Sequence, residues 1–478
     1  MNTFVQAVQA QEARTENGMK ARKSTASKCV DLFFKLGAMR GKDVTKEFVA
    51  AYVEDKDLAL RIAQHARDAR GGSGERKIFR DILVYLEKHD PEAAKALLRK
   101  VPEIGRWDDI RDLTKQSPEI GRWDDIFVFK TEALKSVAYT MLGDALREKN
   151  GLAAKWTPRQ GPIAVEIRKF FGMSPKFYRK SLVEMTKVVE TQMCAKDWDN
   201  INFSHVPSLA AARYKKAFNR NTEAYKAYVA ELMKDPKDRT IEVKVNAGAV
   251  YPYDVLKGRI SHYNTFNKTE LNVIEAQWNA LPNYVGDASI LPLVDVSGSM
   301  TCPAGKNTKL TCLEVAVSLG LYISERNVGP FKDAFVTFSD SHQLQILSGN
   351  LQERYNQLSN ADWAMSTNVE AVFRLILQKA KASNVSAEEM PTMILIMSDM
   401  EFNRGTRGNI GLSAQQMFEK MYAEAGYKMP KVVYWNIQSR NENFPVHFDK
   451  DGTALVSGFS PALLTNLLAG KDLSPVSM

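Results

Sequence analysis

Residues 289–299 have the sequence Ser-Ile-Leu-Pro-Leu-Val-Asp-Val-Ser-Gly-Ser, an apolar run that ends in Asp295-Val296-Ser297-Gly298-Ser299. The apolar run predicts a buried strand, and a helix is expected soon after it, over 309–327. One carboxylate and two hydroxyls on a tight loop supply part of the oxygen shell that Mg²⁺ prefers. Such a pentad arises by chance in roughly one chain in ten of this length. Its sequence context therefore decides what it means.

The context is an alternation of strand and helix patterns downstream of residue 289. Strands are expected at 333–340, 391–400 and 431–439, and helices at 369–382 and 413–426. This alternation predicts a doubly wound α/β sheet, in which ligands bind at the carboxyl ends of the strands. Two further segments offer oxygen ligands near such ends. The expected metal ligands are Asp295, Ser297, Ser299, Thr367 and Asp399.

The expected metal is a divalent cation, with Mg²⁺ favoured and Mn²⁺ or Ca²⁺ as alternatives. The low protein charge leaves the metal electrophilic, so an open position can take a carboxylate from a partner protein. The loop at 301–308, Thr-Cys-Pro-Ala-Gly-Lys-Asn-Thr, is long and contains a proline. It could shield the metal or restrict which ligand reaches it. The alternative interpretation is a capped turn that only looks like a metal site.

The first 240 residues show apolar positions spaced by three and four, which predicts helix after helix. The clearest stretches are 28–39, 46–69, 76–89 and 91–101. Consecutive short helices of this kind indicate an all-helical, HEAT-like repeat stack, which can close into a ring. The pattern changes near residue 240, where a strand-like stretch and a turn are expected over 241–256. We therefore expect two domains, a helical one at 1–285 and an α/β one at 286–478.

Two short motifs stand out in the helical part. Pro-Glu-Ile-Gly-Arg-Trp-Asp-Asp-Ile occurs at 102–110 and again at 118–126, which we interpret as a local tandem duplication. The stretch Gly-Gly-Ser-Gly-Glu-Arg at 71–76 lacks the Gly-Lys-Ser/Thr ending of a phosphate-binding loop and follows a helix, not a strand. We interpret it as a helix break with a new helix starting at Glu75.

Charge is unevenly distributed along the 478 residues, whose net charge is +9. Residues 1–285 carry 49 Lys and Arg against 37 Asp and Glu, whereas residues 286–478 carry 16 against 19. Residues 151–250 alone carry 18 against 10. A basic body beside a mildly acidic domain suggests a polyanionic partner for the body. The alternative is that the charge serves solubility alone.

Cations in the basic part are interleaved with the aromatic residues Trp156, Phe170, Phe171, Phe177, Tyr178, Tyr214 and Phe218. Basic groups can hold phosphates, and aromatic faces can stack on unpaired bases. The alternative is that the aromatics are core residues and the cations a solvated helix face. The candidate RNA-binding residues are Arg70, Arg76, Lys77, Lys155, Arg159, Arg168, Lys169, Lys176, Arg179, Lys180, Arg213, Lys215, Lys216 and Arg220.

Several strings resemble a phage and plant family of uncharacterised function. They include Arg-Asp-Ala-Arg-Gly-Gly-Ser-Gly-Glu-Arg at 67–76, Met-Cys-Ala-Lys-Asp-Trp at 193–198, Tyr-Lys-Lys-Ala-Phe at 214–218 and Ser-Asp-Met-Glu-Phe at 398–402. The design is also similar to that of the Ro autoantigen family. There, a TROVE domain of helical repeats closes into a ring and is joined to a von Willebrand factor A domain.

The resemblance carries implications for both domains. It implies that 286–478 is a von Willebrand factor A-type domain and that the five oxygen ligands form its metal-ion-dependent adhesion site. It also implies RNA binding, because Ro-type rings bind structured small RNA on a basic outer surface and pass single-stranded ends through the hole. RNA binding rests here on analogy of architecture, not on a motif.

Three classes of function follow from these features. The first is a non-catalytic RNA-binding protein whose metal site takes an acidic ligand. The alternative is a protein-interaction scaffold, in which the metal captures a partner carboxylate and no RNA is bound. A metal-dependent hydrolase ranks third, because no general base or nucleophile constellation accompanies the site.

The remaining expectations concern the setting of the protein. No apolar run approaches the ~18 residues of a membrane span, so no membrane partner is expected. The polar N-terminus has no signal-peptide pattern, and the four cysteines are scattered, which favours reduced thiols. We expect a monomer in the cytoplasm, or in the host-cell cytoplasm if the source is a virus.

Overall fold

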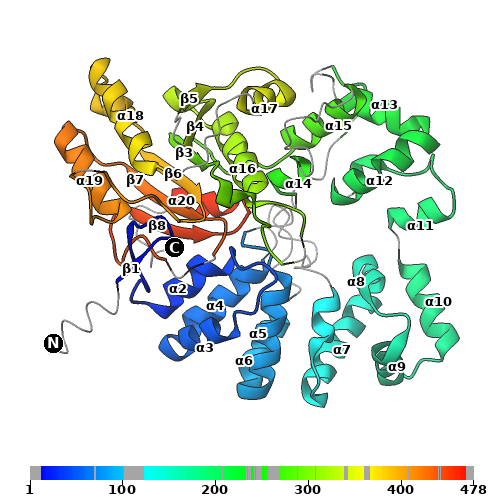
Figure 1. Cartoon of the computed structure of the whole chain (residues 1–478). Coiled ribbons are helices and arrows are strands. Elements are labelled where there is room, and N and C mark those ends of the chain that lie inside the picture. The colour runs from blue at the N-terminus through cyan, green and yellow to red at the C-terminus, as the bar shows by residue number, and fades with distance from the viewer. Residues whose placement is uncertain are drawn as a thin grey trace. The chain divides into compact units, whose positions relative to one another are not determined.

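The structure is a computed structural model (Figure 1). It describes residues 12–68, 71–101, 123–186, 188–206, 208–232, 234, 238–241, 243, 250–256, 268–287, 289–306, 308–338, 343–359, 367–406, 408–439, 441 and 443–469. Two compact units make up the chain. The sheet unit comprises Met1–Ile62, Tyr251–Leu271 and Asn283–Met478, and the helical unit comprises Ala63–Val250 and Asn272–Pro282. These units differ from the ranges 1–285 and 286–478, because the first 62 residues group with the sheet.

The sheet unit is built on six strands in the order β5-β4-β3-β6-β7-β8. Neighbouring strands are parallel throughout, except that β5 runs antiparallel to β4. The strands are β3 (Ile290–Asp295), β4 (Ala334–Phe338), β5 (Gln343–Ile346), β6 (Met393–Ser398), β7 (Lys431–Asn436) and β8 (Thr453–Ser457). The chain passes from β3 outward to β4 and then returns to β6 on the other side of β3. The doubly wound topology predicted from the sequence is therefore present, with its reversal point between β3 and β6.

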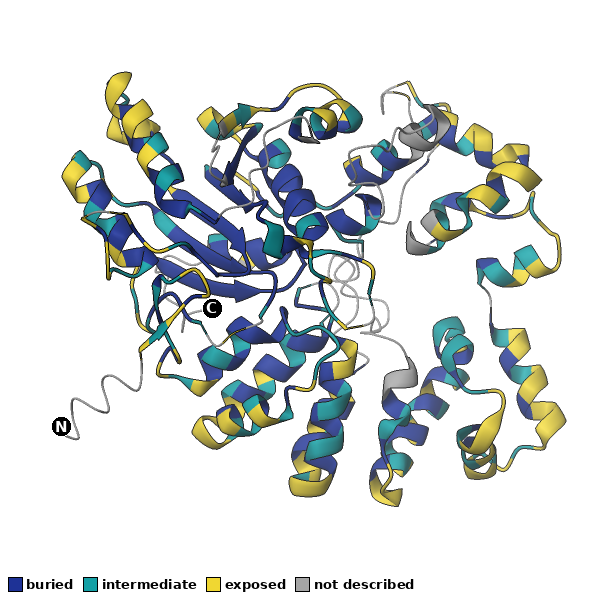
Figure 2. Cartoon of the chain, viewed as in Figure 1, coloured by how far each residue is buried: buried dark blue, intermediate teal, exposed yellow. Residues whose placement is uncertain are grey.

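Helices flank the sheet, whose central strands β3 and β6 are buried along their length, whereas Leu344 and Ile346 of the edge strand β5 are exposed (Figure 2). They are α14 (Pro252–Leu256), α16 (Cys312–Arg326), α17 (Leu351–Ser359), α18 (Val369–Ala382), α19 (Ala414–Ala425) and α20 (Leu463–Ala469). Helices α18 and α19 share one core with alternate residues of the strands, and there the rings of Phe373 and Phe418 stack at 3.6 Å. Helix α16 packs on β3 and β4, where a Cβ added to Gly320 would lie 2.5 Å from Val294 and 2.7 Å from Phe335.

The beginning of the chain packs against the end of the sheet. It forms a hairpin of β1 (Glu12–Arg14) and β2 (Lys20–Arg22), followed by α2 (Lys28–Leu36) and α3 (Thr45–Glu54). Helix α2 packs on β8 and buries Phe34 in the sheet core. At the end of α2 the backbone N–H of Gly37 donates to Ser457 Oγ at 2.9 Å. The apolar face of α2 is thus used by the sheet, although the sequence pattern grouped this helix with those that follow it.

The helical unit is a succession of short helices. They are α5 (Arg76–His89), α6 (Pro91–Lys100), η2 (Trp123–Val128), α7 (Glu132–Arg147), α8 (Gly151–Trp156), α9 (Gly161–Phe170), α10 (Pro175–Met185), α11 (Val189–Cys194), η3 (Phe203–His205), α12 (Ser208–Asn221), α13 (Glu223–Leu232) and most of α15 (Lys268–Asn279). Packing is mainly between neighbours in sequence, such as α5 with α6 and α7 with α8. A helical N-terminal region and a mostly parallel C-terminal sheet are therefore confirmed.

Three expectations for single segments differ from the structure or lie outside it. The helix expected over 46–69 is two helices, α3 and α4 (Lys56–Arg67), because Asp55 is extended and its side chain accepts from the N–H of Leu58. Residues 252–256, in the stretch where a strand and a turn are expected, form the short helix α14. The first Pro-Glu-Ile-Gly-Arg-Trp-Asp-Asp-Ile copy and most of the second lie outside the described residues. None of the helices among the described residues combines the length and apolarity of a membrane span.

The glycine-rich stretch at 71–76 is a helix break, as the sequence predicted. Helix α5 begins at Arg76 with Glu75 as its N-cap residue. The backbone N–H groups of Ser73 and Glu75 donate to the carbonyls of His65 and Ala66 at the end of α4. A Cβ on Gly72 would lie 1.9 Å from the His65 carbonyl oxygen, so only glycine allows this close approach. These N–H groups satisfy helix carbonyls and do not cradle a phosphate.

The contact between α2 and β8 yields a prediction. Exchanging Gly37 for alanine places a Cβ 2.4 Å from the Ser457 carbonyl oxygen, an atom of the strand backbone that has little room to move. Overpacking of this kind costs roughly 1–3 kcal/mol. We expect Gly37→Ala to lower the denaturation midpoint clearly, and Gln378→Ala on the exposed side of α18 to leave it within about 0.5 kcal/mol. Equal midpoints for the two variants would contradict the docking of α2.

Candidate metal centre and nucleic-acid interface

Asp295 and Ser398 end the two central strands, β3 and β6, and face each other at the point where the strand order reverses. Ser398 Oγ donates a hydrogen bond of 2.5 Å to Asp295 Oδ2. The other carboxylate oxygen of Asp295 accepts from the backbone N–H of Ser297 at 2.9 Å. Asp295 is fully buried. Two neighbouring strand ends therefore hold one carboxylate in a fixed orientation.

Ser297 and Ser299 lie on the turn that follows β3. Their hydroxyl oxygens are 3.0 Å apart, and the backbone N–H of Met300 donates to the Ser297 carbonyl at 3.0 Å, which closes the short helix η4 (Gly298–Thr301). Ser297 is buried and Ser299 is half-buried. The turn thus places two hydroxyls side by side, next to the carboxylate that ends the strand.

Asp399 and Thr367 complete the predicted ligand set. Asp399 follows β6 directly, is buried, and accepts from the N–H of Glu401 at 3.3 Å. Met400, which lies between Asp399 and Glu401, adopts a left-handed backbone with φ of +66°. This conformation turns the chain sharply after β6. Farther along this loop, the N–H of Asn403 donates to the Thr367 carbonyl at 3.1 Å. Thr367 is buried just before α18. The contacts thus group Asp295, Ser297, Ser299 and Asp399, and connect Thr367 to the loop that follows Asp399.

Electrostatics at this site are dominated by the two buried carboxylates. Burial, and next the negative charge of Asp399, raise the pKa of Asp295 to about 7. The hydrogen bonds from Ser297 and Ser398 act in the opposite direction. Two carboxylates that repel each other in a buried site are stabilised by a cation bound between them.

The chemistry of the donor set fits a hard divalent cation. It consists of two carboxylates and three hydroxyls, all of them oxygen ligands, which suit Mg²⁺ with several retained waters. Within the described parts of the chain, no group of three or more His, Cys, Asp or Glu is placed to hold a metal. A cation here would therefore depend on the serine and threonine hydroxyls as well as on the carboxylates. Such a set lacks the nitrogen and sulfur ligands that zinc favours.

The loop that follows the pentad is a closed hairpin. Pro303 pairs with Thr311 in a β-bridge, and the Sγ atoms of Cys302 and Cys312 are 3.7 Å apart. The backbone N–H of Lys306 donates to the carbonyl of Arg40 at 3.0 Å. The loop is therefore held against the segment that joins α2 to α3. That it restricts access to a metal remains a prediction.

Glu401 was not singled out from the sequence as a site residue, yet it connects the N-terminal hairpin to the loop that follows β6, residues 399–406. Its carboxylate accepts from the backbone N–H of Glu16 at 2.6 Å and from the Asn443 side chain at 3.0 and 3.1 Å. Thr15 Oγ1 donates to the Phe402 carbonyl at 2.6 Å. Glu401 belongs to the stretch Ser-Asp-Met-Glu-Phe at 398–402, but no local pattern predicts its partners, which lie near residue 16 and near residue 443.

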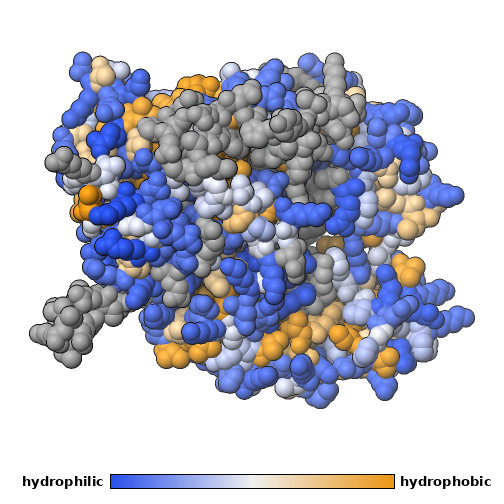
Figure 3. Space-filling model, viewed as in Figure 1, coloured by the Kyte–Doolittle hydropathy of each residue, from blue (hydrophilic) through white to orange (hydrophobic). Residues whose placement is uncertain are grey.

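The predicted RNA-binding cations lie in the helical unit, on helices α5, α8, α9, α10 and α12 and on the segment before α9. Arg70 lies outside the described residues. The exposed members are Arg76, Lys77, Arg159, Lys169, Lys176, Arg179, Lys180, Arg213, Lys216 and Arg220, and the half-buried ones are Lys155, Arg168 and Lys215. Some already have protein partners: Lys77 pairs with Asp81, and Lys155 with Glu190 at 3.1 Å. In the space-filling view, hydrophilic and hydrophobic residues are mixed over this part of the surface (Figure 3).

The aromatic residues among these cations differ in burial, and Trp156, Phe171 and Tyr214 are half-buried. Phe218 and Tyr178 are buried, and Phe218 belongs to a local core with Phe203 and Tyr225. Phe170 and Phe177, in contrast, are 45% and 58% exposed. The core interpretation is therefore correct for Tyr178 and Phe218, while the rings of Phe170 and Phe177 are accessible to a ligand.

Comparison with known families covers both units. The profile of the family described as "Domain of unknown function (DUF2828)" matches residues 15–136 and 164–291, more than half of the chain. The chain belongs to this family. The match to DUF2828 starts at Thr15, in the N-terminal hairpin, which contacts the loop that follows β6. A second profile, "Domain of unknown function (DUF7788)", matches residues 289–476, which contain the six-stranded sheet.

Two individual proteins are similar to this DUF2828 member over nearly its whole length. "Uncharacterized protein L728" of Acanthamoeba polyphaga mimivirus is 29% identical, and the match covers 97% of this chain and 86% of that protein. The crystal structure of the Deinococcus radiodurans RO (RSR) protein aligns with 92% of this chain and 99% of its own, at 15% identity and a TM-score of 0.46.

The role of Glu401 can be tested by limited proteolysis. Glu401→Ala removes the acceptor for the Glu16 N–H and the Asn443 amide, which are partly buried donors. Leaving a fully buried donor unpaired costs roughly 1–3 kcal/mol, so a destabilisation in the lower part of that range is expected here. We expect trypsin to cleave at Lys20 and Arg22 at least about tenfold faster than in the parent chain, since 1.4 kcal/mol corresponds to a factor of ten. Glu424→Ala, at an exposed position of α19, is the control. An unchanged cleavage rate in Glu401→Ala would show that this carboxylate does not hold the N-terminal segment.

Proposed function

We propose that this chain is a non-catalytic RNA-binding protein that also holds a divalent cation at the ends of β3 and β6. The observation that carries RNA binding is the set of exposed cations on α9 and α10, which we call the basic face. Among them, Lys169 is next to Phe170 in the sequence and Lys176 is next to Phe177, and both rings are accessible. The similarity of design to the Ro family supports the same function, with 286–478 as the proposed von Willebrand factor A-type domain and the helical region as the proposed HEAT-like stack.

The basic face suits a flexible polyanion better than an acidic protein. Residues 161–186, which include α9 and α10, carry five Lys and Arg against two Glu. Lys176, Arg179 and Lys180 project from successive turns of α10 and are all exposed. Cations spaced in this way can contact consecutive phosphates, while exposed aromatic rings offer stacking faces that a protein carboxylate does not use.

The proposed cation site has a separate role. Asp295, Ser297, Ser299, Thr367 and Asp399 would hold Mg²⁺, or alternatively Mn²⁺ or Ca²⁺, and leave a position for an acidic ligand. Both carboxylates belong to the proposed ligand set, so neither is available as a general base. This supports binding over hydrolysis. We further propose that the chain acts as a cytoplasmic monomer.

A protein-interaction scaffold is the second candidate function. The observation that favours it is the fixed carboxylate and hydroxyl set at the reversal point of the sheet, which is a typical place for a ligand site. In this case a partner's carboxylate would bind the cation and the basic face would have no RNA to bind. The two functions are distinguished by testing each surface separately.

The RNA-binding proposal predicts a loss of affinity on charge reversal. We expect the triple variant Lys176→Glu, Arg179→Glu, Lys180→Glu to bind single-stranded RNA at least about tenfold more weakly. Its dependence of log affinity on log salt should be shallower by roughly 0.7 for each phosphate contact removed. Filter binding between low and moderate salt measures both quantities.

The matched control reverses three exposed lysines of the sheet unit, Lys379, Lys381 and Lys428, all to glutamate. This control changes the net charge equally and should leave RNA affinity almost unchanged. Equal losses in the two triple variants would indicate non-specific attraction alone. Undetectable RNA binding by the parent chain at low salt would contradict the proposed function.

The metal proposal predicts that calorimetry detects Mg²⁺ binding to the parent chain but not to Asp295→Asn. The amide keeps the shape of the side chain while removing the charge that attracts the cation. Asp451→Asn, an exposed exchange before β8, is the control and should bind Mg²⁺ normally. RNA affinity should be the same in all three proteins. Undiminished Mg²⁺ binding by Asp295→Asn would contradict the site.

A further inference from the structure

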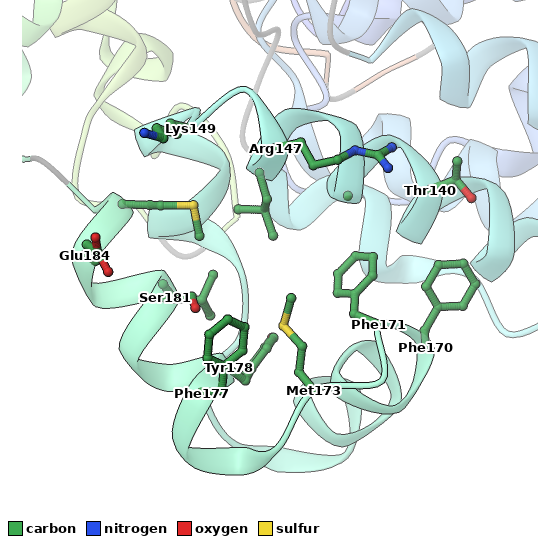
Figure 4. Close-up of a pocket in the computed structure, with 14 residues that line it drawn as sticks. Thr140, Arg147, Lys149, Phe170, Phe171, Met173, Phe177, Tyr178, Ser181 and Glu184 are labelled. Carbon is green, nitrogen blue, oxygen red and sulfur yellow. The ribbon is translucent and has the colours of Figure 1, made fainter.

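A pocket of about 590 Å³ lies between α7 and the α9–α10 hairpin (Figure 4). Its walls are mainly apolar and include Phe170, Phe171, Met173 and Phe177. Its volume falls within the roughly 300–1,000 Å³ that is usual for small-molecule sites. The pocket lies wholly in the helical unit and contains no residue of the proposed metal site. It therefore needs a ligand of its own.

The floor of the pocket depends on a glycine in the middle of α7. A Cβ on Gly143 would lie 2.9 Å from Cε1 of Phe171, so the glycine allows this ring to lie directly on the helix backbone. Phe170 packs edge-on against both Tyr139 and Phe171, at centroid distances of 5.4 and 5.5 Å. Glycine inside a helix costs roughly 0.5–1 kcal/mol relative to alanine. The ring arrangement that it permits is thus a built feature of the unit.

Two cations line one edge of the pocket. Arg147, in the last turn of α7, and Lys149, just after it, are both exposed and lie in the upper part of the close-up (Figure 4). Arg147 also pairs with Asp144 of the same helix. On α10, Lys176 is next to Phe177 in the sequence and Lys180 is one turn from it. Among the lining residues Glu184 is the acidic one. An apolar hollow with a cationic rim complements a ligand that has a flat apolar part and anionic groups on both sides.

We infer that this pocket binds an unpaired nucleobase of single-stranded RNA, an inference that rests on the proposed RNA-binding function. The base would enter between the rings of the α9–α10 hairpin, while the flanking phosphates contact the cations at the rim. A base in a duplex is stacked and paired and cannot enter. An apolar peptide could fill the hollow, but it would leave the cationic rim unused. The pocket thus gives the basic face a preference for unpaired RNA.

The variant Phe177→Ala tests the inference without endangering the fold, because this side chain is 58% exposed. Stacking of a base on an aromatic ring accounts for roughly 5- to 150-fold in affinity. We expect Phe177→Ala to bind a single-stranded RNA about tenfold more weakly and a blunt RNA duplex equally well. Its salt dependence should stay unchanged, because the lost contact carries no charge. Val183→Ala is the control, since Val183 lies on the same helix, is 59% exposed and does not line the pocket.

Photo-crosslinking of the full chain to RNA containing 5-iodouridine, followed by peptide mapping, locates the base. Crosslinks at the Phe170–Phe177 hairpin that disappear in Phe177→Ala would support the inference. RNA binding by the parent chain with equal single-strand affinity in Phe177→Ala, or with equal losses for single strand and duplex, would overturn the pocket but leave the proposed function standing. Crosslinks that map away from this hairpin in the parent chain would also overturn it. Failure of the parent chain to bind any RNA would instead refute the proposed function itself.

Discussion

The hydrogen bond from Ser398 to the buried carboxylate of Asp295 joins the ends of the two central strands. Because β3 and β6 are parallel neighbours, the segments that follow the two strands begin at the same edge of the sheet, at Asp295 and Ser398. The turn with Ser297 and Ser299 follows β3, and the loop with Asp399 and Glu401 follows β6. The burial of Asp295 beside Asp399 makes the site unfavourable unless a cation or a proton offsets the charge. The proposed cation would relieve this constraint.

The loop that follows β6 also contacts the N-terminal hairpin. Glu401 and Phe402 accept hydrogen bonds from Glu16 and Thr15, and farther on α2 docks against β8 through Gly37 and Ser457. The sheet unit therefore includes residues from both ends of the chain, and the helical unit is inserted between them. The DUF2828 match starts in the N-terminal hairpin and ends at the beginning of β3, so it includes part of the sheet unit as well as the helical unit.

Sequence patterns could predict those parts of the structure that depend on local order. The strands β3, β6 and β7 are apolar runs, and the five oxygen ligands occur at the ends of such runs or next to a helix, so their grouping followed from the topology. The docking of α2 could not be predicted, because an amphipathic helix does not specify which surface covers it. The break at Asp55 was missed because the apolar spacing continues through it. Aromatic residues presented the same difficulty: Phe218 and Phe177 both stand among cations, and only the packing of the helices shows that one is buried and the other exposed.

The most direct test of the cation at the centre of this account is a crystal of the full chain grown with Mn²⁺ and measured for anomalous scattering. The account predicts a strong peak between Asp295 and Asp399, with Ser297 and Ser299 oxygens within roughly 2.0–2.6 Å of it, the range for hard cations. The peak should be absent from crystals of Asp295→Asn. A parent crystal with no peak at the ends of β3 and β6, or with a Ser398–Asp295 contact that leaves no room for an ion, would contradict it.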